Sequence, residues 1–358
     1  MSAPRPRIVV GLSGGVDSSV AAALLVEAGF EVVGITLHLA GSASRCCSLE
    51  DADDARRVAE DLGIRFYVAN ETERFRREVM EPFADAYLAG RTPIPCVACN
   101  RRFKFERLVG RARALGADAV ATGHYARVQR DPGTGAHRLL RARDPHKDQS
   151  YFLYDLGQEQ LARARFPLGE LRKDEVRARA RALGLATADK PESQEICFVP
   201  DGDYAKVVEK LRPEALPGEG DVIDGEGRVL GRHAGVHRFT VGQRRGLGLS
   251  AGERYYVRAL DARRNRVVVG PVEELGVRGA ELEDVRWIAG APPPHALRAR
   301  VRIRYRHEGA EARVEAAPGG RARALFDEPV RAVAPGQAAV FYAGDEVLGG
   351  GSIAAPIP

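Results

Sequence analysis

The feature that most constrains the fold is a glycine-rich turn close to the N-terminus. The segment VVGLSGGVDSSVAAALL leads from an apolar run into a helix-forming run through four small residues, Gly11, Ser13, Gly14 and Gly15. Glycines let a chain turn sharply and bring its backbone N–H groups close to an anion. A strand that enters a helix through such a turn is typical of α/β proteins, in which ligands bind beyond the carboxyl ends of the strands.

The residues of this turn indicate phosphate binding. We expect the helix to begin near Asp17 or Ser18, where the helix N-terminus adds its positive end to the backbone donors. A Walker A loop is excluded because its lysine is missing, and the spacing is not that of a dinucleotide fingerprint. The carboxylate of Asp17 would repel a phosphate unless a divalent cation bridged the two.

The pattern that follows the turn predicts a parallel sheet. Short apolar runs alternate with helical segments over residues 7–126, and a further helix is expected from Lys173 to Leu185, with Gly184 as its stop. This β-α-β-α order predicts an α/β fold with helices on both faces of the sheet. From about Asp201 the chain changes to short strands separated by glycine and asparagine turns, which are typical of β modules. We expect the run Pro292–Pro294 to be a linker.

We therefore predict three domains in the 358 residues. They are a parallel-sheet domain at residues 1–200, a small central β domain at 201–275 and a C-terminal β-barrel-like domain at 280–358.

Composition limits the class of protein. The longest apolar run, Val20 to Val26, is far shorter than the roughly 20 residues needed to span a bilayer, so we predict a cytoplasmic protein with no membrane partner. The net charge of +5 is compatible with a nucleic-acid partner without establishing one. Five cysteines, an odd number in a compartment that keeps thiols reduced, favour chemistry or metal binding over a disulfide framework.

The stretch TPIPCVACN places Cys96 and Cys99 three positions apart. A C-x-x-C pair can be half a zinc site, a redox dithiol, a sulfur-carrying nucleophile or part of an iron–sulfur ligand set. No second such pair follows within about twenty residues, as a zinc ribbon requires. A thioredoxin-like arrangement does not fit, because the glycine turn occupies the first strand–helix junction. Cys46 and Cys47 are adjacent, which is a poor geometry for chelating one ion, and we expect them in a loop near the site.

Nine motifs occur in an order that resembles the tRNA-specific 2-thiouridylase family, which belongs to the PP-loop ATP pyrophosphatases. They are SGGVDS, GRTPIPCVACNRRFKF, GADAVATGHYAR, DQSYFLY, SQEICF, FTVGQRRGLG, RIRYRH, PGQAAVFY and LGGGSI. The resemblance covers nearly the whole chain. It implies an enzyme, a sulfurtransferase that uses ATP and Mg²⁺ to place sulfur at position 2 of the wobble uridine, position 34, of tRNA.

The resemblance also implies roles for two cysteines. Cys197 would carry a persulfide received from an upstream sulfur carrier or cysteine desulfurase. After ATP has adenylated O2 of the uridine, the persulfide sulfur would attack C2 and AMP would depart. Cys99 would then resolve the remaining S–S bond, leaving a Cys99–Cys197 disulfide. Thiolate nucleophilicity and thiol–disulfide exchange support such a route. Judged from the sequence alone, the lesser alternative for Cys197 is a small buried apolar residue between Ile196 and Phe198.

One departure from the family pattern leaves a second route open. The familiar motif Pro-Asn-Pro-Asp-x-x-Cys-Asn has an asparagine and an aspartate where this chain has Ile94 and Cys96, so the role of that aspartate cannot be carried over. Cys96, Cys99 and Cys197 could instead hold three irons of a [4Fe–4S] cluster, with the fourth iron open to sulfide. We prefer the persulfide route and keep the cluster as the alternative.

The resemblance further implies two sets of binding residues. Those for ATP are Gly11, Leu12, Ser13, Gly14, Gly15, Val16, Asp17, Ser18, Leu37 and Gly123. Those for tRNA are His124, Lys147, Asp148, Gln149, Arg304, Tyr305 and Gln337. Judged from the residues alone, His124 would be a structural histidine and the lysine–aspartate–glutamine segment a polar loop.

The segment LRARVRIRYR offers an independent argument for RNA. It has arginine at every second position from Arg298 to Arg306, which would place all five on one face of a strand. Like charges in a row repel one another and call for counter-anions such as phosphates. The alternative is that acidic residues on adjacent strands neutralise the row.

Two other functions remain possible at this point. A PP-loop synthetase that forms an amide would need an ammonia source and would leave the cysteines without a role. A non-catalytic RNA-binding protein would hold its nucleotide passively.

Overall fold

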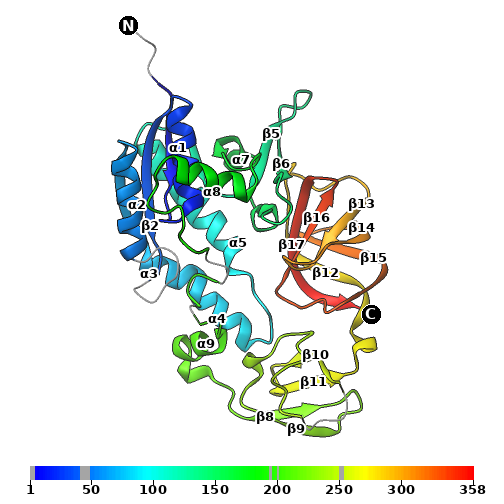
Figure 1. The fold of residues 1–358 in the computed structure, drawn as a ribbon. Coiled ribbons are helices and arrows are strands. Elements are labelled where there is room, and N and C mark those ends of the chain that lie inside the picture. Colours follow the sequence, from blue (N-terminus) through cyan, green and yellow to red (C-terminus); the bar gives the residue numbers. More distant parts are fainter. Residues whose placement is uncertain (1–4, 41–48, 193–195, 200, 250–253) are drawn as a thin grey trace.

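The first part of the chain folds around a five-stranded parallel sheet, as the sequence predicts (Figure 1). The computed structural model describes residues 5–40, 49–192, 196–199, 201–249 and 254–358, so Cys46 and Cys47 lie outside the described residues. The strand order is β3-β2-β1-β4-β7, with every pairing parallel. The bounds are β1 (Arg7–Gly11), β2 (Glu31–His38), β3 (Arg65–Asn70), β4 (Ala119–Thr122) and β7 (Ala164–Arg165).

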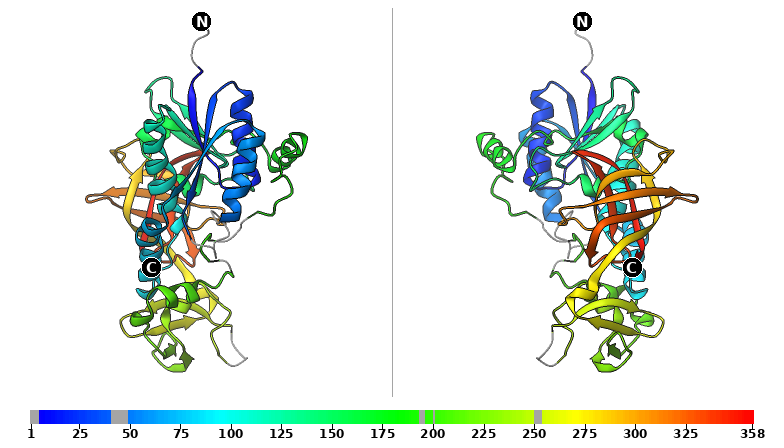
Figure 2. Two further views of the ribbon diagram at one scale, coloured as in Figure 1. Left: turned by 90° about the vertical axis from the view of Figure 1, so that its left-hand side faces the viewer. Right: turned by 90° about the vertical axis from the view of Figure 1, so that its right-hand side faces the viewer.

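Helices cover both faces of this sheet, as the edge-on views in Figure 2 show. Alternation along β1 explains how: Ile8 and Val10 pack toward α1 and α2, whereas Val9 packs toward α6. α1 is in turn covered by α8, which is why it is apolar around most of its circumference. These helices are α1 (Val16–Glu27), α2 (Leu49–Asp61), α6 (Leu108–Ala114) and α8 (Lys173–Ala182).

Two helix boundaries bear on the site. α1 begins at Val16, one residue before the earlier of the two expected starts, with Gly15 in extended conformation as its N-cap. α8 ends before Gly184, whose φ of +65° lets the chain turn away from the helix as predicted.

A helical layer joins β3 to β4 and carries the C-x-x-C pair. It contains two π-helical stretches, η1 and η2, in which each turn is wider than in an α-helix. Its members are α3 (Thr72–Phe75), η1 (Arg76–Met80), α4 (Glu81–Leu88), α5 (Pro95–Cys99) and η2 (Asn100–Arg107). The ring of Phe198, next to Cys197, packs edge-on to Phe75 and Phe83 at 5.9 and 5.1 Å between centroids. These contacts fix the segment that carries Cys197 against the layer that carries Cys99.

A short helix and a four-stranded sheet form the central module, at the bottom of Figure 1. The strand order is β10-β11-β8-β9, with bounds β8 (Gly220–Ile223), β9 (Val229–His233), β10 (Tyr256–Asp261) and β11 (Arg266–Gly270). Helix α9 (Tyr204–Leu211) precedes them and packs back on α4, where the rings of Tyr204 and Tyr87 stack at 4.2 Å. The domain limits near residues 200 and 275 stay predictions.

The C-terminal module is a closed barrel. Its sheet has the order β12-β15-β14-β13-β16-β17, and a further pairing of β12 with β17 closes it. The bounds are β12 (Gly276–Trp287), β13 (Leu297–Arg302), β14 (Ala310–Ala317), β15 (Arg321–Arg331), β16 (Ala338–Ala343) and β17 (Glu346–Ile357). The expectation that Pro292–Pro294 link two modules is wrong, because β12 precedes this run and belongs to the same barrel as β13.

The barrel sheet also takes up a hairpin from the first part of the chain. Strand β6 (His137–Arg141) pairs with β17, and β5 (Ala126–Arg130) pairs with β6. The first module and the barrel therefore share a continuous sheet. No helix of the described residues is long and apolar enough to cross a membrane.

The connection between α4 and α5, residues 89–94, touches both other modules. The backbone N–H of Thr92 donates to the carbonyl of Pro335 at 2.7 Å, and Gln337 Nε2 donates to the carbonyl of Thr92 at 3.0 Å. The hydroxyl of Thr92 donates to that of Thr240 in the central module at 3.4 Å. The connection leads directly into the helix that bears Cys96 and Cys99.

Candidate active site

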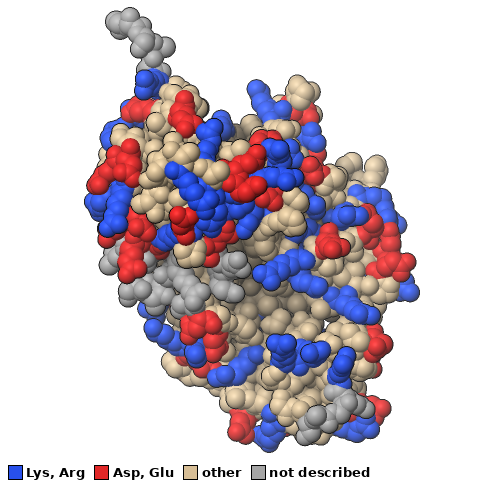
Figure 3. All heavy atoms as spheres, in the orientation of Figure 1, with Lys and Arg blue, Asp and Glu red and all other residues tan. Residues whose placement is uncertain are grey.

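A large cavity of about 1520 Å³ lies at the carboxyl edge of the parallel sheet and extends to the barrel. In the space-filling view, Lys and Arg side chains gather around the hollow between these two parts (Figure 3). All the site residues predicted from the sequence line this cavity except Gly14 and Arg304. The structure thus brings together residues separated by more than 300 positions in the sequence.

At one end of the cavity lies the glycine turn. Helix α1 has no side-chain cap at its N-terminus, so the backbone N–H groups of its first turn are available to an anion. The hydroxyl of Ser18 accepts a hydrogen bond from the N–H of Ser13 at 3.1 Å and donates one to the carbonyl of Gly15 at 3.0 Å, which closes the turn. Gly14 has a φ of +70°, and a Cβ there would lie 2.2 Å from the carbonyl oxygen of Asp51. Only glycine fits that position.

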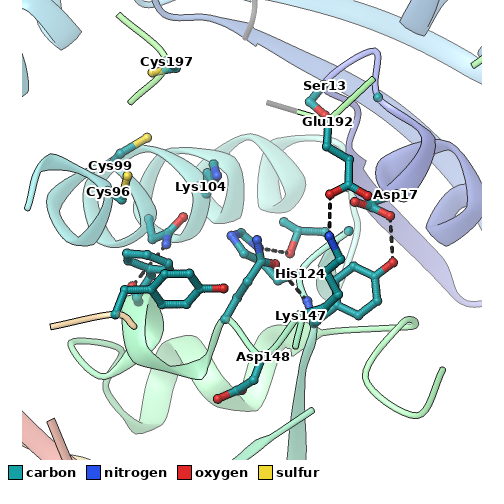
Figure 4. A pocket seen from close by; sticks show the side chains of 18 of the residues that line it. Ser13, Asp17, Cys96, Cys99, Lys104, His124, Lys147, Asp148, Glu192 and Cys197 are labelled. Carbon is teal, nitrogen blue, oxygen red and sulfur yellow. Dashed lines mark hydrogen bonds and ion pairs between the residues drawn. The ribbon is translucent and has the colours of Figure 1, made fainter. Parts of the chain in front are cut away.

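Asp17 lies at the start of α1 and is held by two donors. Lys173 Nζ contacts its Oδ1 at 2.7 Å, and the hydroxyl of Tyr125 donates to the same oxygen at 2.8 Å. Figure 4 shows Asp17 beside Glu192 at this end of the cavity. Burial in the first place, and the charge of Asp17 in the second, raise the pKa of Tyr125, so its phenol stays protonated and keeps donating. Carboxylate oxygens are ligands that Mg²⁺ prefers, so the chemistry of Asp17 fits such an ion.

A second carboxylate lies beside Asp17. Glu192 contacts Lys147 at 2.5 Å and Lys173 at 2.8 Å. Burial alone would raise its pKa, but the two ammonium groups outweigh burial and lower the pKa of Glu192 to about 2. The charges near the phosphate end of the cavity are therefore nearly balanced in this state, and an incoming anion would have to compete with Glu192 and Asp17 for the lysines.

The sequence analysis missed the lysines around this turn. Lys190 contacts the carbonyl of Gly14 at 3.1 Å and Asp51 at 2.7 Å, which fixes the turn from outside. A compositional signal could have found this group: the chain has only six lysines among 54 basic residues, and Lys104, Lys147 and Lys190 line the cavity while Lys173 contacts Asp17.

At the other end of the cavity lie the three described cysteines (Figure 4). Cys96 and Cys99 come from α5, and Cys197 comes from the segment anchored by Phe198. The wider turns of η2 keep Cys99, Lys104 and Leu108 on the face that lines the cavity. Cys99 is buried and Cys197 is half-buried.

The thiols do not form a ready-made metal site. Within the described parts of the chain, no group of three or more His, Cys, Asp or Glu side chains is close enough to hold a metal ion. Cys96, Cys99 and Cys197 all belong to those parts. They are therefore not grouped closely enough to share a single metal ion.

His124 lies in the wall between the two ends. Its Nδ1 and the hydroxyl of Thr122 are 2.7 Å apart, and its ring packs near those of Phe105 and Phe166. Burial in the first place, and the charge of Lys104 in the second, hold the pKa of His124 well below its usual range. The imidazole is therefore neutral at pH 7 and can take part in hydrogen bonds without carrying charge.

Three residues that the resemblance assigns to tRNA have side chains engaged inside the protein. Gln149 accepts from the N–H of Tyr125 at 3.0 Å, and Gln337 donates to Thr92 as described above. The carboxylate of Asp148 is buried and accepts from Ser150 and from Arg302. Arg304 is exposed in the turn that follows β13, and Tyr305 packs its ring against that of Phe152 at 4.5 Å.

The prediction of a row of five arginines facing phosphates from one strand is wrong. Strand β13 ends at Arg302, so Arg304 and Arg306 lie beyond it. Arg298 pairs with Asp327 of β15 at 2.8 Å, and Arg300 pairs with Glu311 of the adjacent strand β14 at 2.9 Å. For these two arginines the alternative prediction is correct, namely that acidic residues on other strands neutralise the row.

Family models match the chain along most of its length. Residues 6–201 match the model described as a tRNA methyl transferase HUP domain. Residues 206–271 match its PRC-barrel domain, and residues 277–353 match an aminomethyltransferase β-barrel domain.

Curated relatives match at high identity. The tRNA-specific 2-thiouridylase MnmA of Geobacter metallireducens is 53% identical, over 98% of this chain and 97% of its own. The protein of the same name from Solibacter usitatus is 52% identical, over 98% of this chain and 100% of its own. Among solved structures, the U34-tRNA thiolase NcsA from Methanococcus maripaludis aligns at 19% identity with a TM-score of 0.36, over 60% of this chain and 69% of its own. On the evidence of the cavity, the three family models and these relatives, the chain belongs to the tRNA-specific 2-thiouridylase family.

Proposed function

We propose that this protein catalyses the ATP-dependent 2-thiolation of the wobble uridine, position 34, of tRNA. One observation carries the proposal: the glycine turn and the thiols of Cys96, Cys99 and Cys197 line the same cavity. A nucleotide held at one end can thus activate a base whose other side faces a sulfur nucleophile. The names of the relatives point to the same reaction.

The phosphate end would perform the adenylation. The N–H groups at the start of α1 and the hydroxyls of Ser13 and Ser18 would bind the triphosphate, and Asp17 would share Mg²⁺ with it. That ion neutralises phosphate charge when it is bound. Lys173 contacts Asp17 and would hold its carboxylate in place for this role. We also propose that Leu37, at the carboxyl end of β2, and Gly123 contact the nucleotide, since both line this part of the cavity.

The thiol end would perform the sulfur transfer. A persulfide on Cys197 attacks C2 of the adenylated uridine, and the C2–O bond breaks as AMP leaves with its electron pair. The thiolate of Cys99 then attacks Cys197 Sγ, which breaks the S–S bond and leaves the sulfur on the base. The product is a Cys99–Cys197 disulfide, which an external thiol reductant must reduce by two electrons before the next cycle.

We propose the persulfide route over the cluster because it needs only thiolate attack and thiol–disulfide exchange by Cys99 and Cys197, and both residues line the same cavity as the glycine turn. The persulfide sulfur would come from a sulfur-carrier protein or cysteine desulfurase. A cytoplasmic location, where thiols are kept reduced, suits this cycle.

The test is pyrophosphate release and 2-thiouridine formation with ATP, Mg²⁺, tRNA and a persulfide donor. We expect release that depends on tRNA and a Cys197→Ser variant that keeps ATP binding but forms no thiouridine. An amide-forming synthetase would instead require ammonia and would not depend on Cys197. A passive RNA-binding protein would release no pyrophosphate under any of these conditions.

A further inference from the structure

Arg302 is the one arginine of the LRARVRIRYR segment whose side chain turns inward from the strand toward the first module. Its side chain is 13% exposed, and that of its partner Asp148 is 5% exposed, with Arg302 Nη1 and Asp148 Oδ2 3.4 Å apart. The guanidinium lies 5.6, 5.9 and 5.8 Å from the ring centres of Tyr151, Tyr305 and Tyr342. A charge so enclosed is poorly placed to reach an RNA phosphate.

The other donors of Arg302 hold the backbone of the turn after β13, residues 303–308. Its Nε donates to the carbonyl of His307 at 2.8 Å, and its Nη2 donates to the carbonyl of Tyr305. The N–H of His307 closes the same turn on the carbonyl of Arg304 at 3.0 Å. The planar fork of arginine can make all these bonds at once, which the single ammonium of lysine cannot.

Asp148 holds the other RNA-facing segment, the loop of residues 147–149, in the same way. Its Oδ1 accepts from the N–H groups of Ala142 and Ser150 at 3.2 and 3.1 Å, and its Oδ2 accepts from the hydroxyl of Ser150 at 3.0 Å. The loop is thereby fixed around a carboxylate that points away from solvent and toward Arg302. Its neighbour Lys147 lines the cavity.

We propose that Arg302 and Asp148 are positioning residues for tRNA, which join the 303–308 turn of the barrel to the 147–149 loop of the first module and do not themselves touch the RNA. This inference rests on the proposed function. The pair sets the exposed Arg304 and the half-buried Tyr305 in one fixed relation to Lys147 before RNA binds. Preorganised contacts of this kind raise affinity by reducing the ordering cost of binding.

The direction in which one substitution changes the Kd for tRNA distinguishes this proposal from direct phosphate binding by Arg302. Asp148→Asn keeps an acceptor for the loop N–H groups but removes the charge that holds Arg302. If Arg302 bound a phosphate, removing the competing carboxylate would tighten tRNA binding. If the pair positions the two segments, the same change loosens them and raises the Kd for tRNA, by roughly tenfold for the loss of one charged hydrogen bond.

The experiment measures the Kd of the full chain for tRNA, the KM for tRNA and kcat at saturating tRNA, with the Kd for ATP as a check of folding. We expect Asp148→Asn and Arg302→Lys each to raise the Kd and KM for tRNA roughly tenfold, with kcat and ATP binding kept. The effect of the double variant on the Kd for tRNA should be smaller than the two single effects combined, because both substitutions act on the same junction. Arg300→Lys, on the same strand but exposed and paired with Glu311, is the matched control and should behave as the unmodified protein.

Tighter or unchanged tRNA binding by Asp148→Asn would overturn the inference, as would an Arg302→Lys variant with the original Kd. If Arg302→Lys no longer binds ATP, which would indicate that this variant does not fold, the Kd of Asp148→Asn for tRNA alone decides the test. Failure of the unmodified protein to bind tRNA would count against the proposed function itself, so the two failures are distinguishable.

Discussion

Replacing Gly123 by alanine should weaken ATP binding through a backbone clash. Gly123 follows β4, and a Cβ there would lie 2.7 Å from both the carbonyl carbon of Asp17 and the N–H nitrogen of Ser18. Ordinary contact begins at 3.4 Å, so the peptide between Asp17 and Ser18 must move by 3.4 − 2.7 = 0.7 Å. Both neighbours are backbone atoms of the first turn of α1, so no side chain can turn aside to relieve the clash.

The size of the effect follows from the donors that this peptide carries. A clash of this kind costs about 1–3 kcal/mol of stability, which a domain with roughly 5–15 kcal/mol tolerates, so Gly123→Ala should remain folded. Moving the helix N-terminus by most of an ångström removes at least one hydrogen bond to a charged phosphate, worth about 1.5–3 kcal/mol. That loss corresponds to roughly 10- to 150-fold weaker ATP binding.

Isothermal titration of ATP in the presence of Mg²⁺ measures the change, alongside a thermal unfolding curve. Gly110→Ala is the matched control, because Gly110 lies on α6 and a Cβ at that position would have nothing within 4 Å. That substitution should leave the Kd for ATP unchanged and stabilise the protein by about 0.5–1 kcal/mol. ATP binding by Gly123→Ala within twofold of the original would refute the reasoning.

Three further expectations concern the cysteines, a carboxylate and an exposed arginine. Cys99→Ser should abolish repeated turnover in the thiolation assay without changing the Kd for ATP, whereas Cys96→Ser should still thiolate. If Cys96→Ser instead loses both its activity and its bound iron, the result would favour the cluster. Because its folded pKa of about 2 lies below the ordinary value of 4.5, Glu192 stabilises the fold fully above pH 4.5 and loses that contribution as the pH falls toward 2. The free energies of unfolding of the original protein and of Glu192→Gln, measured with urea, should therefore differ most near neutral pH and become equal in acid. A difference that stays the same at every pH would contradict this. Arg298→Ala should leave the Kd for tRNA and its salt dependence unchanged, because Asp327 already pairs with Arg298 and exposed pairs contribute only about 0.2–1 kcal/mol; a salt slope lower by about one would instead identify a phosphate contact.

Local patterns in the sequence predicted the parallel sheet and both ends of the cavity. The glycine turn lies where a strand meets a helix, and that junction alone determines its place at the carboxyl edge of the sheet. The resemblance supplied the cysteine roles, and the structure places all three described cysteines along the same cavity as the turn. These features depend on residues that are near one another in the chain or on a match to known motifs.

The features that the sequence could not predict depend on contacts between distant segments. Lys173 reaches Asp17 across 156 positions, and no periodicity links the two. The inward turn of Arg302 depends on Asp148, which is 154 positions away and belongs to another module. For the same reason, the hairpin of β5 and β6 could not be assigned to the barrel sheet, since its partner β17 is formed by the last residues of the chain.

The connection between α4 and α5 ties catalysis to the assembly of the whole molecule. The peptide groups on both sides of Thr92 are bonded to the barrel, and its hydroxyl to the central module, only a few residues before the C-x-x-C pair. A movement of the barrel relative to the first module must either break these bonds or carry the start of α5 with it. The place of the C-x-x-C pair therefore depends on how the barrel and the central module are assembled against the first module, and not on the first module alone.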